Sequence, residues 1–507
     1  MKQLSMTDAF MLAVENERQR LQMASVSILA PPAPGESPVT RQRLRDLVAE
    51  RIHLAPALRH KLRHVPLGLD YPYWIEDAAL DLDHHVREFT LPEPGNDRQL
   101  ADAAAELVSQ PLDHSRPLWE LHVINGLPDG RVAVLFKLHH AAVDGISGLE
   151  LHTLIFDRSP EGREVPPPAV PPGEPMPSTW QMLARGVASL PFQPVRAVLG
   201  GARAVPYLDQ LMPFRVTPGA GTISGAARSM ARLARLGGDS MLLQGDSLRP
   251  PTTVLDRPVT GRRRWAFRRV PLDDAKRIKN HFGVTLNDVV VAATAGAIRS
   301  WLLELGELPA APLVALVPIS VRTGSEDSGG NLVQVMLVKL PTNEADPQAR
   351  LRRTHEALRA AKERHNAVPA TAMRNADELL MPALFIQATR AATLLAGLKG
   401  ATANAVISNV PGPTTEVYLA GSRVRHSTPS EGWSRDSASA RSSSATAAAS
   451  TSDSSSTETA RPTRGDSPKL TTAASGSCWP SCPTVCPGNA RIEPLITGYK
   501  RLTRPTG

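Results

Sequence analysis

The chain has 507 residues, which is enough for two to four domains with sizeable cores. Apolar residues make up 42% and charged residues 21%, the balance of a soluble globular protein. The net charge of +8 favours anionic partners such as acidic lipid headgroups. No nucleic-acid motif accompanies that charge, and aromatic residues make up only 4%, so we expect no nucleic-acid partner.

The first half reads as mixed α/β structure over residues 1–158. Apolar spacing predicts helices over Val39–Arg51 and Leu100–Gln110. Two strands are predicted over Leu121–Asn125 and Arg131–Leu138, joined by the turn Gly126–Gly130. These elements predict a first domain whose last strand ends next to a pair of histidines.

A proline-rich stretch separates the two halves. Eight of the eighteen residues from Pro160 to Pro177 are proline, which predicts a stiff connection. We assign 159–260 to this linker and a long crossover, with a helix over Trp180–Leu199. The second domain, 261–425, contains predicted strands over Arg264–Leu272, Leu313–Val321, Leu332–Leu340 and Asn404–Asn409, and predicted helices over Asp273–Phe282, Thr285–Leu305, Ala349–His365 and Ala370–Leu398.

The last segment, 426–507, differs in composition from everything before it. From His426 to Ala460, 18 of 35 residues are Ser or Thr. Such a stretch buries too little apolar surface to offset the entropy of ordering it, which predicts disorder. All three cysteines lie here, at Cys478, Cys482 and Cys486, and their spacing lacks a fourth ligand, so we expect no metal site. The absence of earlier cysteines is typical of a reducing cytoplasm.

The segment His139–Gly145 (HHAAVDG) is the candidate for chemistry. A strand that ends at Leu138 delivers two histidines to a loop, where a rigid scaffold holds an exposed ring. Histidine suits general-base work near neutral pH. Asp144 could orient a ring, and Gly145 permits a tight turn. On spacing alone, catalysis, loop support and a metal site all stay open.

HHxxxDG after a strand resembles the active-site signature of the CoA-dependent acyltransferase superfamily, and the chain as a whole is similar to the bacterial wax ester synthase/diacylglycerol acyltransferase family. Seven blocks agree in order over about 420 residues, far more than one motif offers. They are Leu4–Phe10 (LSMTDAF), Pro111–Glu120 (PLDHSRPLWE), His139–Gly145, Asn287–Asp288, Pro318–Arg322 (PISVR), Gly330–Asn331 and Ser408–Pro413 (SNVPGP).

This resemblance implies two chloramphenicol-acetyltransferase-like domains of mixed sheet and helices, an α/β (α+β) fold. It implies that His140 is the general base in a central tunnel, that Asp144 pairs with an arginine, for which Arg322 is the candidate, and that His139 supports the loop. The substrates would be acyl-CoA and diacylglycerol, with no further cofactor. A long-chain alcohol, giving a wax ester, is the alternative acceptor, and a non-catalytic acyl-lipid-binding relative is the alternative outside enzymes.

The sequence and the resemblance also predict where the protein is located. The first twenty residues do not resemble a secretory signal, and no apolar run reaches the length of a membrane span, so we expect a cytoplasmic protein held peripherally at the inner membrane face or at lipid droplets.

Asn287 and Asp288 fit the first turn of a helix, where capping alone favours them. Pro117, Leu118 and Trp119 are expected in the core, where they could line the acyl tunnel.

The resemblance ends near Val424, although the family continues into further strands and a final helix. We interpret 426–507 as the product of a frameshift near codon 425, which would leave the second domain truncated and its activity in doubt. A native disordered tail is the competing account, but it leaves the missing strands unexplained.

Overall fold

The structure is a computed structural model, and it describes residues 1–17, 20–32, 34–35, 37–143, 154–167, 177–193, 222–226, 250–256, 261–267, 270–320, 333–366, 382, 403–409 and 415–429. Helices and strands are mixed throughout these residues, which confirms the mixed α/β prediction. The predicted Ala370–Leu398 helix, apart from residue 382, and nearly all of the predicted disordered tail lie outside them.

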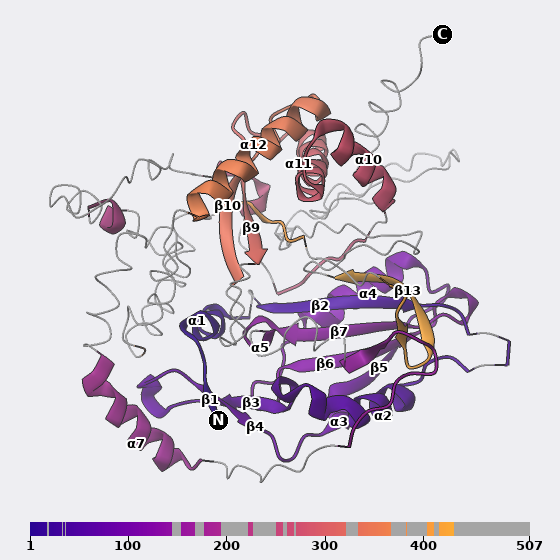
Figure 1. Cartoon of the computed structure of the whole chain (residues 1–507), viewed down its shortest axis with the longest axis vertical. Helices are drawn as coiled ribbons and strands as arrows, with labels where there is room; N and C mark the ends of the chain where they lie inside the picture. The colour runs from indigo at the N-terminus through magenta and orange to yellow at the C-terminus, as the bar shows by residue number, and fades with distance from the viewer. Residues whose placement is uncertain are drawn as a thin grey trace, which may run out of the picture.

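A seven-stranded sheet forms the centre of the first half (Figure 1). Its strand order is β5-β6-β7-β2-β13-β12-β8, with β5 and β6 parallel and the other neighbouring pairs antiparallel. The strands are β2 (Gln22–Leu29), β5 (Val86–Thr90), β6 (Trp119–Asn125), β7 (Ala133–His139), β8 (Phe156–Asp157), β12 (Tyr418–Leu419) and β13 (Ser422–Pro429). The predicted hairpin is confirmed: β6 and β7 pair across the 126–130 turn.

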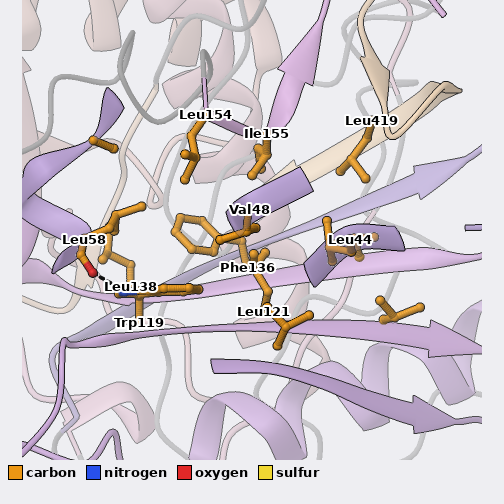
Figure 2. Close-up of a cluster of buried hydrophobic side chains, with 14 of the residues drawn as sticks. Leu44, Val48, Leu58, Trp119, Leu121, Phe136, Leu138, Leu154, Ile155 and Leu419 are labelled. Carbon is orange, nitrogen blue, oxygen red and sulfur yellow. Dashed lines mark hydrogen bonds between the residues drawn. The ribbon is translucent and has the colours of Figure 1, made fainter. Parts of the chain in front are cut away.

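Both faces of this sheet are covered, because side chains alternate along each strand. Leu121 of β6 and Phe136 of β7 pack in one cluster with helix α2 (Arg41–Arg51), as Figure 2 shows. Ile124 and Leu135 point to the opposite face and pack with α4 (Asp97–Ser109). Each fully buried apolar side chain of this kind contributes ~1.5–3 kcal/mol to the free energy of unfolding. The central strands β6 and β7 therefore have an apolar cluster on each face and a hydrogen-bonded strand along each edge.

The smaller elements of the first half surround this sheet. Helix α1 (Met6–Val14) packs against the short helix α5 (His140–Val143). A three-stranded sheet has the order β1-β4-β3. The remaining elements are β1 (Lys2–Gln3), β3 (His60–Arg63), β4 (Tyr73–Glu76), α3 (Leu82–His85), α7 (Thr179–Ser189) and 3₁₀ turns at Ile52–Leu54, Pro56–Arg59, Pro66–Gly68, Pro128–Gly130, Leu190–Phe192 and Val254–Asp256.

The second half has its own sheet, in the order β10-β9-β11, and its own core. Val291 and Trp301 of one helix pack there with Val317 and Val338 of the strands. The elements are α10 (Leu272–Phe282), α11 (Leu286–Glu304), β9 (Leu313–Ser320), β10 (Val333–Leu340), α12 (Pro347–Asn366) and β11 (Ala405–Val406). Each of the corresponding predictions is confirmed to within a few residues.

One predicted strand is wrong. Residues 264–267 have no regular structure, and Leu272 begins α10 instead of ending a strand. The alternation of apolar and basic residues has another cause: Trp265 and Phe267 pack against the α4 side of the first-half sheet. The segment thus binds the second half of the chain to the first through side chains rather than through strand pairing.

The chain returns to the first sheet after the second half. β13 pairs antiparallel with β2, with Val424 opposite Leu29 and Pro429 opposite Ser25. Sequence patterns predict a boundary at 425, but the strand continues four residues beyond it. The sheet of the first half therefore contains strands from both ends of the described chain.

Among the described helices, none is both long and apolar enough to cross a membrane by itself. Helices α10 and α11 reach that limit only when taken together, across a bend of 105°.

A buried ion pair between Arg51 and Asp157 joins α2 to β8 at the edge of the large sheet. Arg51 Nη2 lies 2.9 Å from Asp157 Oδ2, and the two side chains are 3% and 2% exposed. We expect Asp157→Asn to lower the free energy of unfolding by about 3–5 kcal/mol, because it leaves a buried guanidinium without its counter-charge. Urea titration measures this loss. Asp102→Asn, which removes an exposed pair with Arg98, is the control and should cost less than about 1 kcal/mol. Equal losses in the two variants would contradict the prediction.

Candidate active site

The two histidines of HHAAVDG lie at the end of the central strand β7. His139 is its last residue and pairs with Gln22 of β2, and His140 begins α5. Because β7 has a hydrogen-bonded neighbour on each side, its end cannot move independently of the sheet. The fold therefore places both residues on a rigid support, as the sequence predicts.

The backbone around the histidines is fixed by three successive hydrogen bonds. The amide of His139 donates to the carbonyl of Leu118 at 3.0 Å, and the amide of His140 donates to the carbonyl of Leu21 at 2.9 Å. The amide of Ala141 then donates to Nδ1 of the His139 ring at 3.1 Å. Each of these three amides therefore has a partner, which limits the conformations open to His140.

The two rings differ in exposure. His139 is fully buried, at 0% exposure, whereas His140 is partly exposed. A general base must come within hydrogen-bond distance of the proton that it removes. Of the two, His140 has the exposure that such contact needs, whereas His139 is buried and accepts the amide of Ala141.

A carboxylate that sequence reasoning missed lies beside the buried histidine. Glu15, the residue after α1, has Oε2 3.0 Å from Nε2 of His114 and 3.3 Å from Nε2 of His139. The rings of His114 and His139 meet edge to face, with centroids 5.8 Å apart. His114 stands inside the PLDHSRPLWE block, but nothing in the sequence marks Glu15 except its position after an apolar helix.

Burial and hydrogen bonding shift the pKa values of Glu15 and His139 in opposite directions. Burial is the largest influence on Glu15 and raises its pKa, but the hydrogen bonds and charges of His114 and His139 together lower the pKa to about 2. Burial lowers the pKa of His139, and it prevails over the carboxylate of Glu15, which acts to raise it. At neutral pH the site thus contains an ionised Glu15 beside a neutral His139.

Glu15, His114 and His139 also form the one group that could hold a metal ion among the described residues, with ligand atoms within 4.8 Å of one another. A His₂Glu set suits zinc. However, Nδ1 of His139 accepts the Ala141 amide, so the ring proton of neutral His139 lies on Nε2, facing Glu15. A metal at Nε2 would have to displace that proton. The ring proton of His139 therefore favours a contact with the carboxylate over a metal centre.

The predicted core residues of the PLDHSRPLWE block are buried, and two of them make contacts that bear on the site. Leu118 supplies the carbonyl that accepts the His139 amide. Trp119 is 1% exposed, and its ring stacks on that of His85 with centroids 4.3 Å apart. Its Nε1 donates a hydrogen bond to the carbonyl of Leu58 at 2.7 Å (Figure 2). Pro117 is also buried. This block therefore positions the end of β7 from the side of β6.

Asn287 and Asp288 lie in the first turn of α11. Asp288 and Thr285 form a capping box, as the spacing predicts, and Asp288 Oδ2 also lies 2.8 Å from Nδ1 of His355. Asn287 accepts a hydrogen bond from Asn409 of the SNVPGP block at 3.2 Å. Both residues thus connect elements of the second half. Asp144, Gly145 and Arg322 lie outside the described residues.

Two family models match the chain. The model described as the wax ester synthase/diacylglycerol acyltransferase catalytic domain matches residues 4–290, and the model of the C-terminal domain of that family matches 329–435. The second match extends ten residues past the predicted boundary at 425.

Known proteins resemble the chain over most of its length. Two proteins of Mycobacterium tuberculosis strain H37Rv, both named as diacylglycerol O-acyltransferases, are 33% identical over 426 residues and 34% identical over 428 residues. These alignments cover 84% and 83% of this chain and 79% and 87% of the relatives. A solved structure, the wax ester synthase/diacylglycerol acyltransferase from Marinobacter aquaeolei VT8, is 27% identical, covers 85% of this chain and 87% of its own, and has a TM-score of 0.56.

The lowered pKa of Glu15 predicts how this site responds to acid. A group whose pKa is lower in the folded state stabilises the protein above its unfolded pKa, and that contribution is lost as the pH falls through the folded value. We therefore expect Glu15 to contribute stability at pH 5 that disappears between about pH 4.5 and pH 2. Urea unfolding at pH 5 and pH 3 should show a smaller acid-induced loss for Glu15→Gln than for the wild type. An identical loss in both proteins would contradict the assignment.

Proposed function

Because the chain belongs to the wax ester synthase/diacylglycerol acyltransferase family, we propose that it is an O-acyltransferase that moves a long-chain acyl group from acyl-CoA to the hydroxyl of diacylglycerol. The general base in this proposal is His140. The observation that carries it is the contrast at the end of β7, where a fully buried His139 stands next to a partly exposed His140 with a fixed backbone.

The reaction needs one proton relay. An alcohol is a poor nucleophile until a base takes its proton in the transition state, and a neutral imidazole can do so near pH 7. His140 removes the hydroxyl proton while the oxygen attacks the thioester carbonyl. The tetrahedral oxyanion then collapses, the carbon–sulfur bond breaks, and the departing CoA sulfur takes up the proton from the imidazolium. The products are triacylglycerol and free CoA, and the base returns to its starting state.

Substitution of the base tests this proposal. Purified His140→Ala, incubated with radiolabelled acyl-CoA and diacylglycerol, should form triacylglycerol about 10²–10⁴-fold more slowly than the wild type, the range expected when a general base is lost. His53→Ala is the matched control, because His53 is also partly exposed but contacts the carbonyl of Pro166. Full activity of His140→Ala would refute the role of His140.

The same assay separates the alternative acceptors. A wax ester synthase would esterify hexadecanol in preference to diacylglycerol, and both products can be resolved by thin-layer chromatography. A non-catalytic relative would bind acyl-CoA, measurable by calorimetry, and form neither ester in excess of the His140→Ala variant.

We also propose that the protein works at a lipid surface, on the inner face of the membrane or on lipid droplets, because its acceptor is a membrane lipid. Helix α7 supports this location. Its inner side packs tightly, since a Cβ on Gly186 would lie 2.7 Å from Val65. Its outer side is apolar: Trp180 is 78% exposed and Val187 52%, and Phe192 in the turn that follows is 62% exposed. An exposed apolar surface of this kind marks an interaction site.

The position and charge of this surface suit a bilayer. α7 lies at the periphery of the molecule (Figure 1). Arg185 is the single charged residue between Ser178 and Gln193, and it is exposed. An apolar face with a positive charge complements anionic lipid headgroups.

Vesicle binding tests this surface. We expect Trp180→Ser/Phe192→Ser to bind vesicles of phosphatidylcholine and phosphatidylglycerol at least tenfold more weakly than the wild type in a sedimentation assay, since each aromatic side chain buried in lipid is worth ~1.5–3 kcal/mol. Leu303→Ser is the control, because Leu303 is an apolar side chain that is also exposed, at 52%, but lies on α11. If the double variant binds as strongly as the control, α7 is not the docking surface.

A further inference from the structure

Three segments far apart in the sequence meet at the carboxylate of Glu15. Glu15 follows α1, His114 precedes β6, and His139 ends β7. The side chain of Glu15 is only 6% exposed. A buried carboxylate is costly unless its charge is paired or hydrogen-bonded, so its presence needs a reason.

The contacts of the His139 ring indicate what this carboxylate does. The Ala141 amide occupies Nδ1, so the ring proton lies on Nε2, which is 3.3 Å from Glu15 Oε2 in an electrostatic contact whose geometry is not that of a well-aligned hydrogen bond. The carboxylate therefore favours the one tautomer of His139 whose Nδ1 can accept a backbone amide. His114 contacts the same oxygen at 3.0 Å and so helps to hold the carboxylate in place.

The amide held in this way belongs to the peptide bond that follows His140. That peptide is planar, so fixing the N–H of Ala141 also fixes the carbonyl of His140. The amide of His140 is itself bonded to the carbonyl of Leu21. His140 thus stands between two restrained peptide groups, one held by a main-chain carbonyl and the other by the ring that Glu15 orients.

Glu15 is itself well supported. Helix α1 begins with a cap in which Ser5 Oγ accepts the amide of Asp8 at 3.1 Å. The helix packs against α5, which His140 begins. The carboxylate is therefore held relative to the turn that it acts upon.

From this chain of contacts we propose that Glu15 is a positioning residue for the reaction. It acts through the tautomer and orientation of the His139 ring, which holds the turn that presents His140, and His114 supports the carboxylate. This inference rests on the proposed role of His140 as general base. It also gives the opening block and the PLDHSRPLWE block a shared task at the active site, since one leads into Glu15 and the other contains His114.

The first experiment removes the acceptor while keeping the size of the side chain. Glu15→Met should lower kcat for triacylglycerol formation about 10–100-fold, the loss typical when the polar partner that orients a functional histidine is removed. KM for acyl-CoA and for diacylglycerol should change less than twofold, because Glu15 does not contact either substrate in this proposal. Glu15→Gln keeps one oxygen as an acceptor and should recover part of the loss. Asp77→Asn is the matched control: Asp77 is a buried carboxylate paired with Lys61 away from the site, and its loss should leave kcat unchanged.

The second experiment tests whether Glu15 acts through His139. His139→Asn places an oxygen near the position of Nδ1, where it can still accept the Ala141 amide, but it has no atom that reaches Glu15. If the route is correct, His139→Asn lowers kcat, and adding Glu15→Met to it lowers kcat less than twofold further. Multiplying losses in the double variant, or an unchanged kcat in Glu15→Met, would overturn the proposal. His140→Ala is measured in parallel: if it stays fully active, the proposed base is wrong, whereas an inactive His140→Ala beside an active Glu15→Met refutes the role of Glu15 alone.

Discussion

The end of strand β7 is the constraint on which the rest of the candidate site depends. β7 is bordered by β6 and β2 and covered on both faces by apolar clusters, so its last residue has a fixed position. The next residue, His140, is the first that can leave the sheet. Rigidity and exposure are usually opposed, and a strand terminus is a place where a folded chain provides both.

Buried polar groups near this end of the sheet lie beside polar partners, but both carboxylate oxygens of Glu15 and Nε2 of His139 are buried without a well-aligned hydrogen bond. Lys137 of β7 is fully buried, and its ammonium contacts Glu120 at 2.9 Å and donates to two main-chain carbonyls. Glu15 and His139 form the corresponding pair at the strand end. Unpaired charges at either place would destabilise the sheet by several kcal/mol. The pairing therefore serves stability along the strand, and at the strand end it also restrains the ring of His139.

The sequence predicts local features of this site well and its long-range contacts poorly. The β6–β7 hairpin, the cap at Thr285 and the position of the histidines all follow from residues close together in the chain. The contacts of Glu15 do not, because its partners lie about 100 and 124 residues away and no periodicity connects them. The wrong strand at 264–267 has the same origin: alternation identifies residues that face a core, but it does not distinguish strand pairing from a segment packed through its side chains.

The return of the chain to the first sheet bears on the hypothesis of a change of reading frame near codon 425, because β13 and the match to the family's C-terminal domain model both extend past that point. β13 pairs with β2 from Val424 to Pro429, and this pairing crosses the point near codon 425 where the sequence predicts a change of reading frame. Strand pairing uses main-chain amides and carbonyls, which every residue except proline provides, so the pairing of His426, Ser427 and Thr428 does not require particular side chains. The backbone can therefore continue the ladder for four residues past that point. β2 then keeps a neighbour on both sides, and the carbonyl of Leu21, the residue before β2, accepts the amide of His140.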